Sequence, residues 1–328
     1  TGTNSDILVT TIPATGLADV ILTAEDGILD TNGVDSNRIT ADDLNMSSSS
    51  ASGTQDGIDV DTDVNSVTAD VNTNAGGLRI DEVDGITLTQ LTTFDGSISV
   101  NAAGTIEVLD VTSTNNSSSD LNNGITLTAT GVDSDILVTS LTAENTADIT
   151  LNADRDVLDS DSTDSQLTSG DLLTIVAGRN IGGITNVFTA DGFDPLQTSV
   201  AHLDLTSGNQ IVIDNTGTTP ELINLDAGTG TAGTTYVRAT GGALDASTTI
   251  GISNTQDTIS FISDVSITVP TGLQTANLRL DAPDIIDAGG GAIDVNAVNS
   301  ILFKSSSAET VNITAQQFDG TVLGSDFV

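Results

Sequence analysis

Two groups of aspartates are spaced as calcium ligands often are. Asp59, Asp61 and Asp63 resemble the opening of an EF-hand loop, in which alternate carboxylates bind the ion. Val64, however, stands where that loop needs a glycine to turn. In a strand, the three carboxylates would instead face solvent about 7 Å apart. That separation exceeds the roughly 5 Å that two oxygens on one calcium span. We therefore expect a solvated strand face here, with calcium as the alternative.

The second group of aspartates follows a predicted strand, in a stretch rich in turn residues. Its members are Asp156, Asp159, Asp161 and Asp164. Turn carboxylates and backbone carbonyls can converge on one ion, so this group is better placed than the first to bind calcium. Nothing in the chain matches the glycine-rich nonapeptide calcium repeat. Calcium is therefore the only ion that we consider, and we expect that no cofactor is required.

Two other candidate sites have a simpler structural explanation. The segment 228–233 (GTGTAG) fits the dinucleotide-binding fingerprint, but the β-favouring Thr234-Thr235-Tyr236-Val237 follows it, so no helix is available to bind a pyrophosphate. His202 is the only histidine and cysteine is absent, which excludes cysteine nucleophiles and histidine-based metal centres. The alternating segment 200–205 predicts that His202 points to solvent. We expect no catalytic and no cofactor-binding residues.

The charge of the chain argues against several partners and activities. The chain has 46 acidic residues against 7 Lys and Arg, which gives a net charge of -39. Nucleic acids and anionic membranes would be repelled. The same repulsion, a single lysine (Lys304) and scarce aromatic residues argue against the polysaccharide-cleaving enzymes that some β-helices form. We expect no enzymatic activity, and polysaccharide degradation is the least favoured alternative.

The composition predicts a chain rich in turns and poor in helices. Almost all of the acid is aspartate, which favours turns, whereas glutamate favours helices. Aromatic residues make up 2% of the chain and Trp and Cys are absent, so the core must be built from aliphatic side chains. The high charge also fits intrinsic disorder, but the aliphatic runs recur too regularly for a disordered chain. No apolar run approaches the roughly 20 residues of a transmembrane helix, so we expect no membrane insertion.

A long internal repeat is the most informative feature of the sequence. Ser5-Asp6-Ile7-Leu8-Val9-Thr10 recurs as Ser134-Asp135-Ile136-Leu137-Val138-Thr139, and the likeness continues in register as far as Asp30 and Asp159. Repeats of this kind indicate stacked structural units.

A shorter phrase, an aliphatic residue followed by Thr and a small residue, recurs within the long repeat. It begins at Ile12, Ile39, Val67, Leu91, Val111, Leu141, Leu167 and Phe188. The steps of 20 to 30 residues match the size of one solenoid coil. Alternating apolar pairs, such as Ile98/Val100 and Ile106/Val108, lie between successive phrases and predict two further strands. We therefore predict an all-β parallel solenoid with three short strands per coil.

The expected corners and loops lie between these strands. Asp95-Gly96, Ala103-Gly104, Asn123-Gly124 and Gly182-Gly183 are turn signals. Two polar stretches, 47–50 and 115–119, are expected to form loops of variable length. Coils should be regular over residues 1–200, and residues 201–328 should continue the solenoid with looser coils or form a related second segment. Like charges stacked about 5 Å apart cost on the order of 1 kcal/mol per pair in water, so salt or calcium should stiffen the stack.

The sequence resembles the repeat region of filamentous haemagglutinin-like exoproteins, which are large secreted bacterial adhesins. The resemblance is carried by the segments 85–89 (GITLT), 124–129 (GITLTA) and 148–153 (DITLNA), together with the aliphatic-Thr-Ala phrase. It covers residues 1–200 well and the remainder weakly. It implies a right-handed parallel β-helix, export across the outer membrane, and a role in adhesion or biofilm formation. The family's N-terminal secretion domain has no match here.

These observations together predict a non-catalytic structural rod of an extracellular bacterial surface protein, such as an adhesin stalk or biofilm scaffold. The expected partners are neighbouring copies or further coils of the same protein, and host or biofilm ligands. The chain begins Thr1-Gly2-Thr3 without Met, so we expect a processed product or an excerpt. The alternative is a self-assembling filament or surface-layer subunit joined end to end, because the strand edges at the ends of a solenoid need a partner. The outward positions mix Asp, Asn and Thr, which argues against an ice-binding surface.

Overall fold

The computed structural model shows an all-β chain. It describes residues 5–14, 16, 18–30, 38–49, 57–72, 76–114, 123–160, 166–169, 171–184, 193–216, 219–228, 233–248, 254–290, 293–306 and 311–320. Within these residues every regular element is a β-strand and none is a helix. The strands stack in parallel as a β-solenoid with about 23 residues per coil, as predicted.

Two compact units make up the chain, Thr1–Asp171 and Leu172–Val328. This division falls before the change in regularity that we expect near residue 200. In the first unit the strands are β1 (Ile7–Val9), β2 (Ile12–Pro13), β3 (Val20–Ala24), β4 (Ile28–Asp30), β5 (Ile39–Ser48), β6 (Ile58–Val71), β7 (Leu78–Glu82), β8 (Ile86–Phe94), β9 (Ile98–Ala102), β10 (Ile106–Val108), β11 (Val111–Thr114), β12 (Ile125–Ala129), β13 (Ile136–Val138), β14 (Ser140–Ala143), β15 (Ile149–Ala153), β16 (Asp156–Asp159) and β17 (Gln166–Ser169).

The second unit contains the remaining strands. They are β18 (Leu172–Ala177), β19 (Asn180–Ile181), β20 (Gly183–Ile184), β21 (Phe193–Asp194), β22 (Leu196–Ser199), β23 (His202–Ser207), β24 (Gln210–Thr216), β25 (Glu221–Ala227), β26 (Thr234–Thr240), β27 (Leu244–Asp245), β28 (Asn254–Ser263), β29 (Ser266–Val269), β30 (Leu273–Asp281), β31 (Asp284–Asp287), β32 (Ile293–Lys304) and β33 (Val311–Gly320). Only β20 and β21 pair antiparallel among the described strands.

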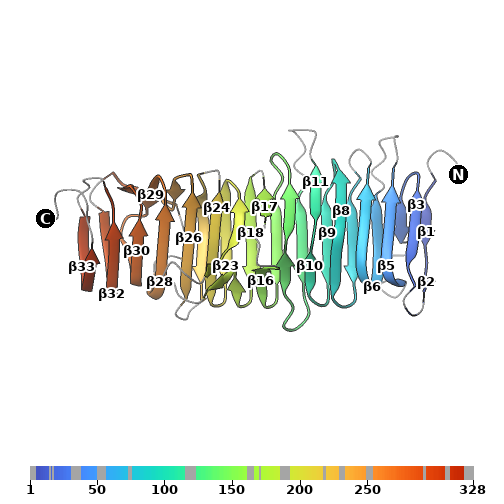
Figure 1. The fold of residues 1–328 in the computed structure, drawn as a ribbon, viewed down its shortest axis with the longest axis horizontal. Coiled ribbons are helices and arrows are strands. Elements are labelled where there is room, and N and C mark those ends of the chain that lie inside the picture. Colours follow the sequence, from blue (N-terminus) through green and yellow to red (C-terminus); the bar gives the residue numbers. More distant parts are fainter. Residues whose placement is uncertain are drawn as a thin grey trace. The chain divides into compact units, whose positions relative to one another are not determined.

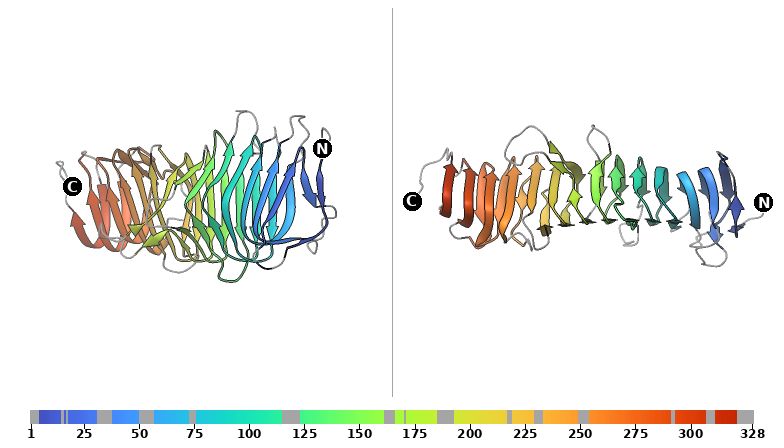
Figure 2. Two further views of the ribbon diagram at one scale, coloured as in Figure 1. Left: turned by 45° about the vertical axis from the view of Figure 1, so that its right-hand side comes forward. Right: turned by 90° about the horizontal axis from the view of Figure 1, so that it is seen from below.

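Three parallel ladders run through the first unit, one for each strand of a coil. The first ladder aligns Leu78, Ile98, Ile125 and Ile149. The second aligns Ile86, Ile106, Ile136 and Val157, and the third aligns Leu91, Val111, Leu141 and Leu167. In each unit, the corresponding strands of successive coils lie side by side (Figures 1 and 2). The prediction of three strands per coil is confirmed for these coils of the first unit. In the second unit, from β23 to β30, each strand pairs with the second strand after it, as β24 does with β26 and β26 with β28.

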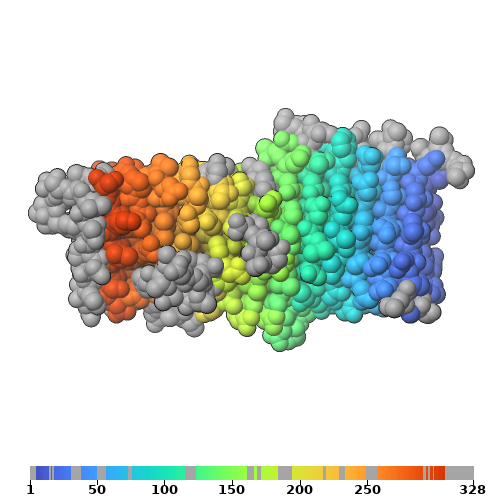
Figure 3. Space-filling view, in the orientation of Figure 1, coloured from blue at the N-terminus to red at the C-terminus, as the bar shows by residue number. Residues whose placement is uncertain are grey.

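The period-two pattern of the strands explains why they form. In β12, Ile125, Leu127 and Ala129 are buried, while Thr126 and Thr128 point outward. Stacking each strand between two others satisfies its backbone groups and also buries one apolar face. The second unit has an equivalent ladder, which aligns Ile213, Val237, Phe261 and Leu280. Figure 3 shows the outward side chains of successive coils as adjacent bands.

One predicted register in the first unit is wrong. The repeated phrase placed Ile39, Val67 and Leu91 in equivalent positions. The structure pairs Ile39 with Thr62, and pairs Val67 with Leu88. A register shift between Val67 and Thr68 then brings Ala69 opposite Leu91. From Leu91 to Leu167 the phrase and the ladder agree. Val67 lies opposite Leu44, in the middle of the long strand β5, whereas Ile39 is the first residue of that strand. The spacing of the phrase alone could not reveal this difference.

The loop expected at residues 47–50 is also wrong in its first half. Ser47 and Ser48 are the last residues of β5, and Ser48 is completely buried. The Ser48 hydroxyl donates a hydrogen bond to the backbone carbonyl of Asp26 in the preceding coil. Inward-facing hydroxyls of this kind satisfy carbonyl groups at the corners of the solenoid, which a polar run in the sequence does not reveal. The other expected loop, 115–119, lies outside the described residues.

Close approach between coils explains one predicted corner glycine. Asp95 has a positive φ of 57°, and Gly96 follows it in the turn. A Cβ added to Gly96 would lie 2.0 Å from the carbonyl oxygen of Gly76 in the previous coil. Only glycine allows the corner to stack this tightly.

Candidate functional site

A buried glutamate at the end of β7 is the most unusual polar group in the first unit. Glu82 is 4% exposed. Its Oε2 accepts a hydrogen bond from the backbone N–H of Val64 (3.1 Å), and its Oε1 accepts from Val83 (2.8 Å) and Asp84 (3.4 Å). Burial raises the pKa of the Glu82 carboxyl, while these hydrogen bonds act in the opposite direction. The carboxyl thus ties β6 to the corner that follows β7.

Three carboxylates meet at this corner. Asp63 on β6, Glu82 and Asp84 each place one oxygen within 4.8 Å of the others. Hard cations such as calcium prefer oxygen ligands of this type. Asp63 was among the predicted ligands, whereas Glu82 and Asp84 were not predicted. The available signal was that glutamate is rare in this chain and that Glu82 continues the inward alternation of Leu78 and Ile80.

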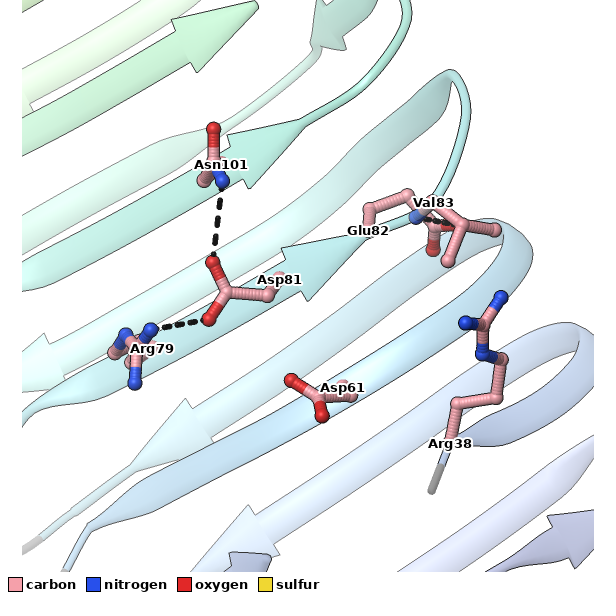
Figure 4. Close-up of a pocket in the computed structure, with 7 residues that line it drawn as sticks. All are labelled: Arg38, Asp61, Arg79, Asp81, Glu82, Val83 and Asn101. Atoms are coloured by element: carbon pink, nitrogen blue, oxygen red, sulfur yellow. Dashed lines mark hydrogen bonds and ion pairs between the residues drawn. The ribbon is translucent and has the colours of Figure 1, made fainter. Parts of the chain in front are cut away.

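A surface cavity of about 360 Å³ lies beside this corner (Figure 4). Its lining residues are Arg38, Asp61, Arg79, Asp81, Glu82, Val83 and Asn101. Two of the seven basic residues of the chain therefore line one cavity. The cavity combines arginine guanidinium groups with carboxylates, so it can offer hydrogen-bond donors and acceptors to a polar ligand.

Arg79 and Asn101 neutralise and orient Asp81 within the cavity. The Arg79 guanidinium binds Asp81 on its own strand and Asp59 on the previous coil, the latter at 3.4 Å. The Asn101 amide donates to the other oxygen of Asp81 at 3.3 Å. Figure 4 shows both partners directed at Asp81. Asp61 lies one coil before Asp81 in the same ladder.

Asp59, Asp61 and Asp63 lie as the strand interpretation predicted. All three are on the outward face of β6, and the intervening Val60 and Thr62 are buried. Asp61 lines the arginine-lined cavity, Asp59 pairs with Arg79, and Asp63 lies at the Glu82 corner. No EF-hand loop forms at these residues, since β6 continues to Val71. Calcium binding by these carboxylates remains a prediction.

The aspartates of the second predicted group have different surroundings from one another. Asp156 is 1% exposed, and its carboxylate lies 3.6 Å from Arg155 Nε. Asp159 ends β16, in register with Val138. Asp161 and Asp164 lie outside the described residues. Calcium binding by this group stays a prediction.

The Arg155 side chain binds an aspartate of the neighbouring coil. Its Nε donates to Asp135 Oδ1 at 2.7 Å, and its terminal nitrogen pairs with the other carboxylate oxygen. The hydrogen bond to Asp135, aided by the nearby charge of Asp156, holds the pKa of the Arg155 guanidinium above its ordinary value. Asp135 also accepts the backbone N–H of Asp156 at 3.1 Å. This arrangement is a cross-coil clamp, and its carboxylates already have donors.

Many outward carboxylates have a neutral donor in the adjacent coil. The pairs, donor first, are Asn65 with Asp42 (2.6 Å), Ser66 with Asp43 (2.5 Å), Asn101 with Asp81 (3.3 Å), Asn224 with Asp204 (3.0 Å) and Thr240 with Asp214 (2.8 Å). A hydrogen bond to a carboxylate is stronger than one between neutral groups. These donors were not predicted, and the outward aspartates were expected to be stacked like charges, because the sequence does not give the register between coils.

His202 and the residues that follow the glycine-rich segment both lie on strands. His202 begins β23 with its side chain outward and 35% exposed, and its Nε2 lies 3.4 Å from a carboxylate oxygen of Glu221 in the next coil. The glycine-rich segment follows β25, and β26 begins at Thr234. The predicted absence of a helix after this segment is confirmed.

No protein-family model matches the chain, and no curated protein or solved structure was found to be similar to it. Among the described residues there is no helix of the length and apolarity needed to cross a membrane. The fold and the geometry of the site therefore carry the functional argument.

Proposed function

We propose that the chain is a structural stalk segment of an extracellular bacterial surface protein. The observation that carries this proposal is that outward side chains form hydrogen bonds with those of the neighbouring coils. Asp42, Asp81 and Asp204 each accept a hydrogen bond from a side chain one coil later. A solenoid held in this way on its surface as well as in its core suits a spacer, whose length depends on the number of coils.

The chemistry of the interior supports the same proposal. Aliphatic side chains such as Leu127, Leu151 and Leu205 are completely buried. The net charge of -39 keeps such a stack soluble, and the absence of cysteine suits a secreted protein that needs no disulfide bonds. Adhesion or scaffolding in a biofilm is the role that we propose for the parent protein, with host or biofilm ligands as partners.

Deletion of one whole coil tests the proposal. Leu78 is in register with both Ile58 and Ile98, so removing residues 78–97 should leave Ile58 facing Ile98. We expect this variant to fold cooperatively. When it is displayed on a cell surface with a terminal epitope, the epitope should lie closer to the membrane than in the full chain, as measured by fluorescence interference.

Deletion of half a coil, residues 78–87, is the matched control. It removes β7 without restoring the register, so we expect loss of the cooperative unfolding transition. Two results would overturn the stalk proposal. One is equal tolerance of both deletions. The other is depolymerisation of a glycan by the purified chain that is abolished by Asp61→Asn or Asp81→Asn in the cavity.

A further inference from the structure

A second surface cavity, the glycine-lined cavity, adjoins the arginine-lined cavity of Figure 4. Its volume is about 320 Å³, and Arg79 lines both cavities. Asp59 and Arg79 are in register, as are Asp61 and Asp81 two residues further along the same strands. The two cavities therefore follow each other along β6 and β7, with Arg79 as their common wall. The other residues that line the second cavity include Leu29, Gly57, Asp59, Gly77 and Ser97.

The glycine-lined cavity lies where two corners stack backbone to backbone. Gly57 and Gly77 stand immediately before β6 and β7. A Cβ added to Gly57 would lie 1.8 Å from the carbonyl oxygen of Gly77, so this corner needs glycine. Glycine backbone, the half-buried Leu29 and Ser97 thus form a wall that carries less charge than that of the arginine-lined cavity.

The polar groups of the arginine-lined cavity are held in place and still have hydrogen-bonding capacity. Asp81 accepts one hydrogen bond on each carboxylate oxygen, from Arg79 and from Asn101. Arg79 donates from each terminal nitrogen, to Asp81 and to Asp59. A carboxylate offers about four acceptor positions and a guanidinium about five donors. Acceptors of Asp81 and donors of Arg79 therefore remain for a ligand, on groups that binding need not rearrange.

The charges of the arginine-lined cavity indicate a ligand without net charge. Arg38 and Arg79 stand there against three carboxyl groups, whereas the whole chain has 7 basic and 46 acidic residues. A cationic ligand would meet two guanidinium groups, and an anionic ligand would meet the carboxylates and the charge of the chain. Among the described residues that line this cavity, Val83 is the only apolar one, which disfavours an apolar ligand.

Hydroxyl groups match this mixture of donors and acceptors. Each hydroxyl donates one hydrogen bond and accepts about two. Neighbouring hydroxyls of a sugar can thus donate to a carboxylate and accept from a guanidinium. We propose that the two cavities together bind a short neutral oligosaccharide. The hydroxyls of one sugar residue lie against Asp61, Asp81 and Arg79. The C–H face of the next residue lies over Gly57 and Gly77, where the wall carries less charge.

This inference goes beyond the stalk proposal, because a spacer needs no ligand, and it rests on the two cavities alone. Binding should be weak, since no aromatic residue is among the described residues that line either cavity and no ring can stack on the sugar. We expect a dissociation constant on the order of 1 mM for a trisaccharide.

Saturation-transfer NMR of the full chain tests the inference, with trisaccharides of glucose, galactose and mannose and the methyl glycoside of each sugar as probes. We expect at least one neutral trisaccharide to bind saturably, and more tightly than its methyl glycoside, because it reaches both cavities. The corresponding uronic acid and spermidine should not compete with it at matched ionic strength. Competition by either one, equal affinity for the trisaccharide and the methyl glycoside, or the absence of saturable binding would overturn the inference.

Two matched variants locate the site. Asp61→Asn should weaken trisaccharide binding by about tenfold, because it removes a charged acceptor from the arginine-lined cavity. Asp204→Asn is the control. Asp204 is also outward and half-buried and accepts a hydrogen bond from Asn224 in the next coil at 3.0 Å, but it lines neither cavity. This control should bind as the wild type does.

Circular dichroism and thermal melting would establish that both variants fold. Loss of binding in both folded variants, or in neither, would contradict the proposed site. A chain that binds no neutral oligosaccharide would leave the stalk proposal unaffected, whereas cleavage of a bound glycan is the separate result that would overturn that proposal.

Discussion

Arg155 and Asp135 form a bidentate contact between consecutive coils, and the 2.7 Å hydrogen bond from Arg155 Nε is one half of it. Asp135 is 6% exposed and also accepts the backbone N–H of Asp156. Asp135 therefore binds both the Arg155 side chain and the first residue of β16 in the next coil.

Replacing Arg155 should destabilise the first unit. Arg155→Gln leaves the nearly buried Asp135 carboxylate without its cationic partner, so we expect a lower urea midpoint. Arg79→Gln is the matched control, because Arg79 also pairs with two aspartates but its side chain is 58% exposed. Its loss should cost less than about 1 kcal/mol. Equal effects of the two substitutions would contradict the clamp.

Glu82 should make stability depend on pH in a defined direction. Burial raises its folded-state pKa above the ordinary value of 4.5. The folded state thus holds the proton more tightly than the unfolded state. The resulting stabilisation is complete below the ordinary pKa and is lost as the pH rises through the folded value. Glu82→Gln removes this titration, so the stability of the wild type relative to the variant should fall from pH 4 upward. Parallel urea-midpoint curves for the two proteins would refute this assignment.

Salt should stabilise the fold, and calcium can be separated from salt. With a net charge of -39, screening relieves repulsion, so the thermal midpoint should rise with NaCl. Calcium at matched ionic strength should add a further increase if the corner formed by Asp63, Glu82 and Asp84 binds it, and Asp84→Asn should abolish that increase. A calcium curve identical to the NaCl curve would remove calcium from the account of this protein.

Substitution by alanine should have different effects on stability at buried and at exposed positions of β12. Leu127 is completely buried, and Leu127→Ala should cost about 2–5 kcal/mol in the free energy of unfolding. The adjacent Thr126 is exposed, and Thr126→Ala should change stability by no more than about 0.5 kcal/mol. Urea denaturation of both variants measures the two values. Similar costs would argue against the inward alternation of β12.

Two neighbouring corner glycines should also differ. A Cβ on Gly96 would meet the Gly76 carbonyl oxygen at 2.0 Å, whereas a Cβ on Gly77 would meet Ser97 Oγ at 3.4 Å, an ordinary contact. We expect Gly96→Ala to lower the thermal midpoint and Gly77→Ala to leave it close to that of the wild type. A Gly96→Ala protein as stable as the wild type would show that the corner can move apart.

The strand positions could be predicted from the sequence because burial and alternation coincide. Ile125, Leu127 and Ala129 alternate with polar residues, and this pattern places them inside any parallel coil. The register between coils was harder to predict. Along β5 and β6 the phrase does not identify which residues face each other, because Val67 lies opposite Leu44 and Leu88.

The candidate site was predictable only in part, for a related reason. The carboxylates on β6 are visible as alternating aspartates, but the partners Arg79 and Asn101 come from later coils. Their positions depend on the exact number of residues per coil. Glu82 and Ser48 are polar residues at inward positions, where a hydrophobic pattern expects none. Each is held by backbone groups that only the folded chain brings close.

The hydrogen bond from Asn101 to Asp81 depends on a side-chain amide that can be hydrolysed over time. Hydrolysis of the Asn101 side-chain amide would turn the donor into a second carboxylate, facing the first across a gap now bridged at 3.3 Å. The attraction between the two side chains would then become a repulsion of about 1 kcal/mol in water. Hydrolysed amides would accumulate with time at the asparagines, and each would remove one hydrogen bond between coils. The aliphatic side chains of the interior would not undergo this reaction.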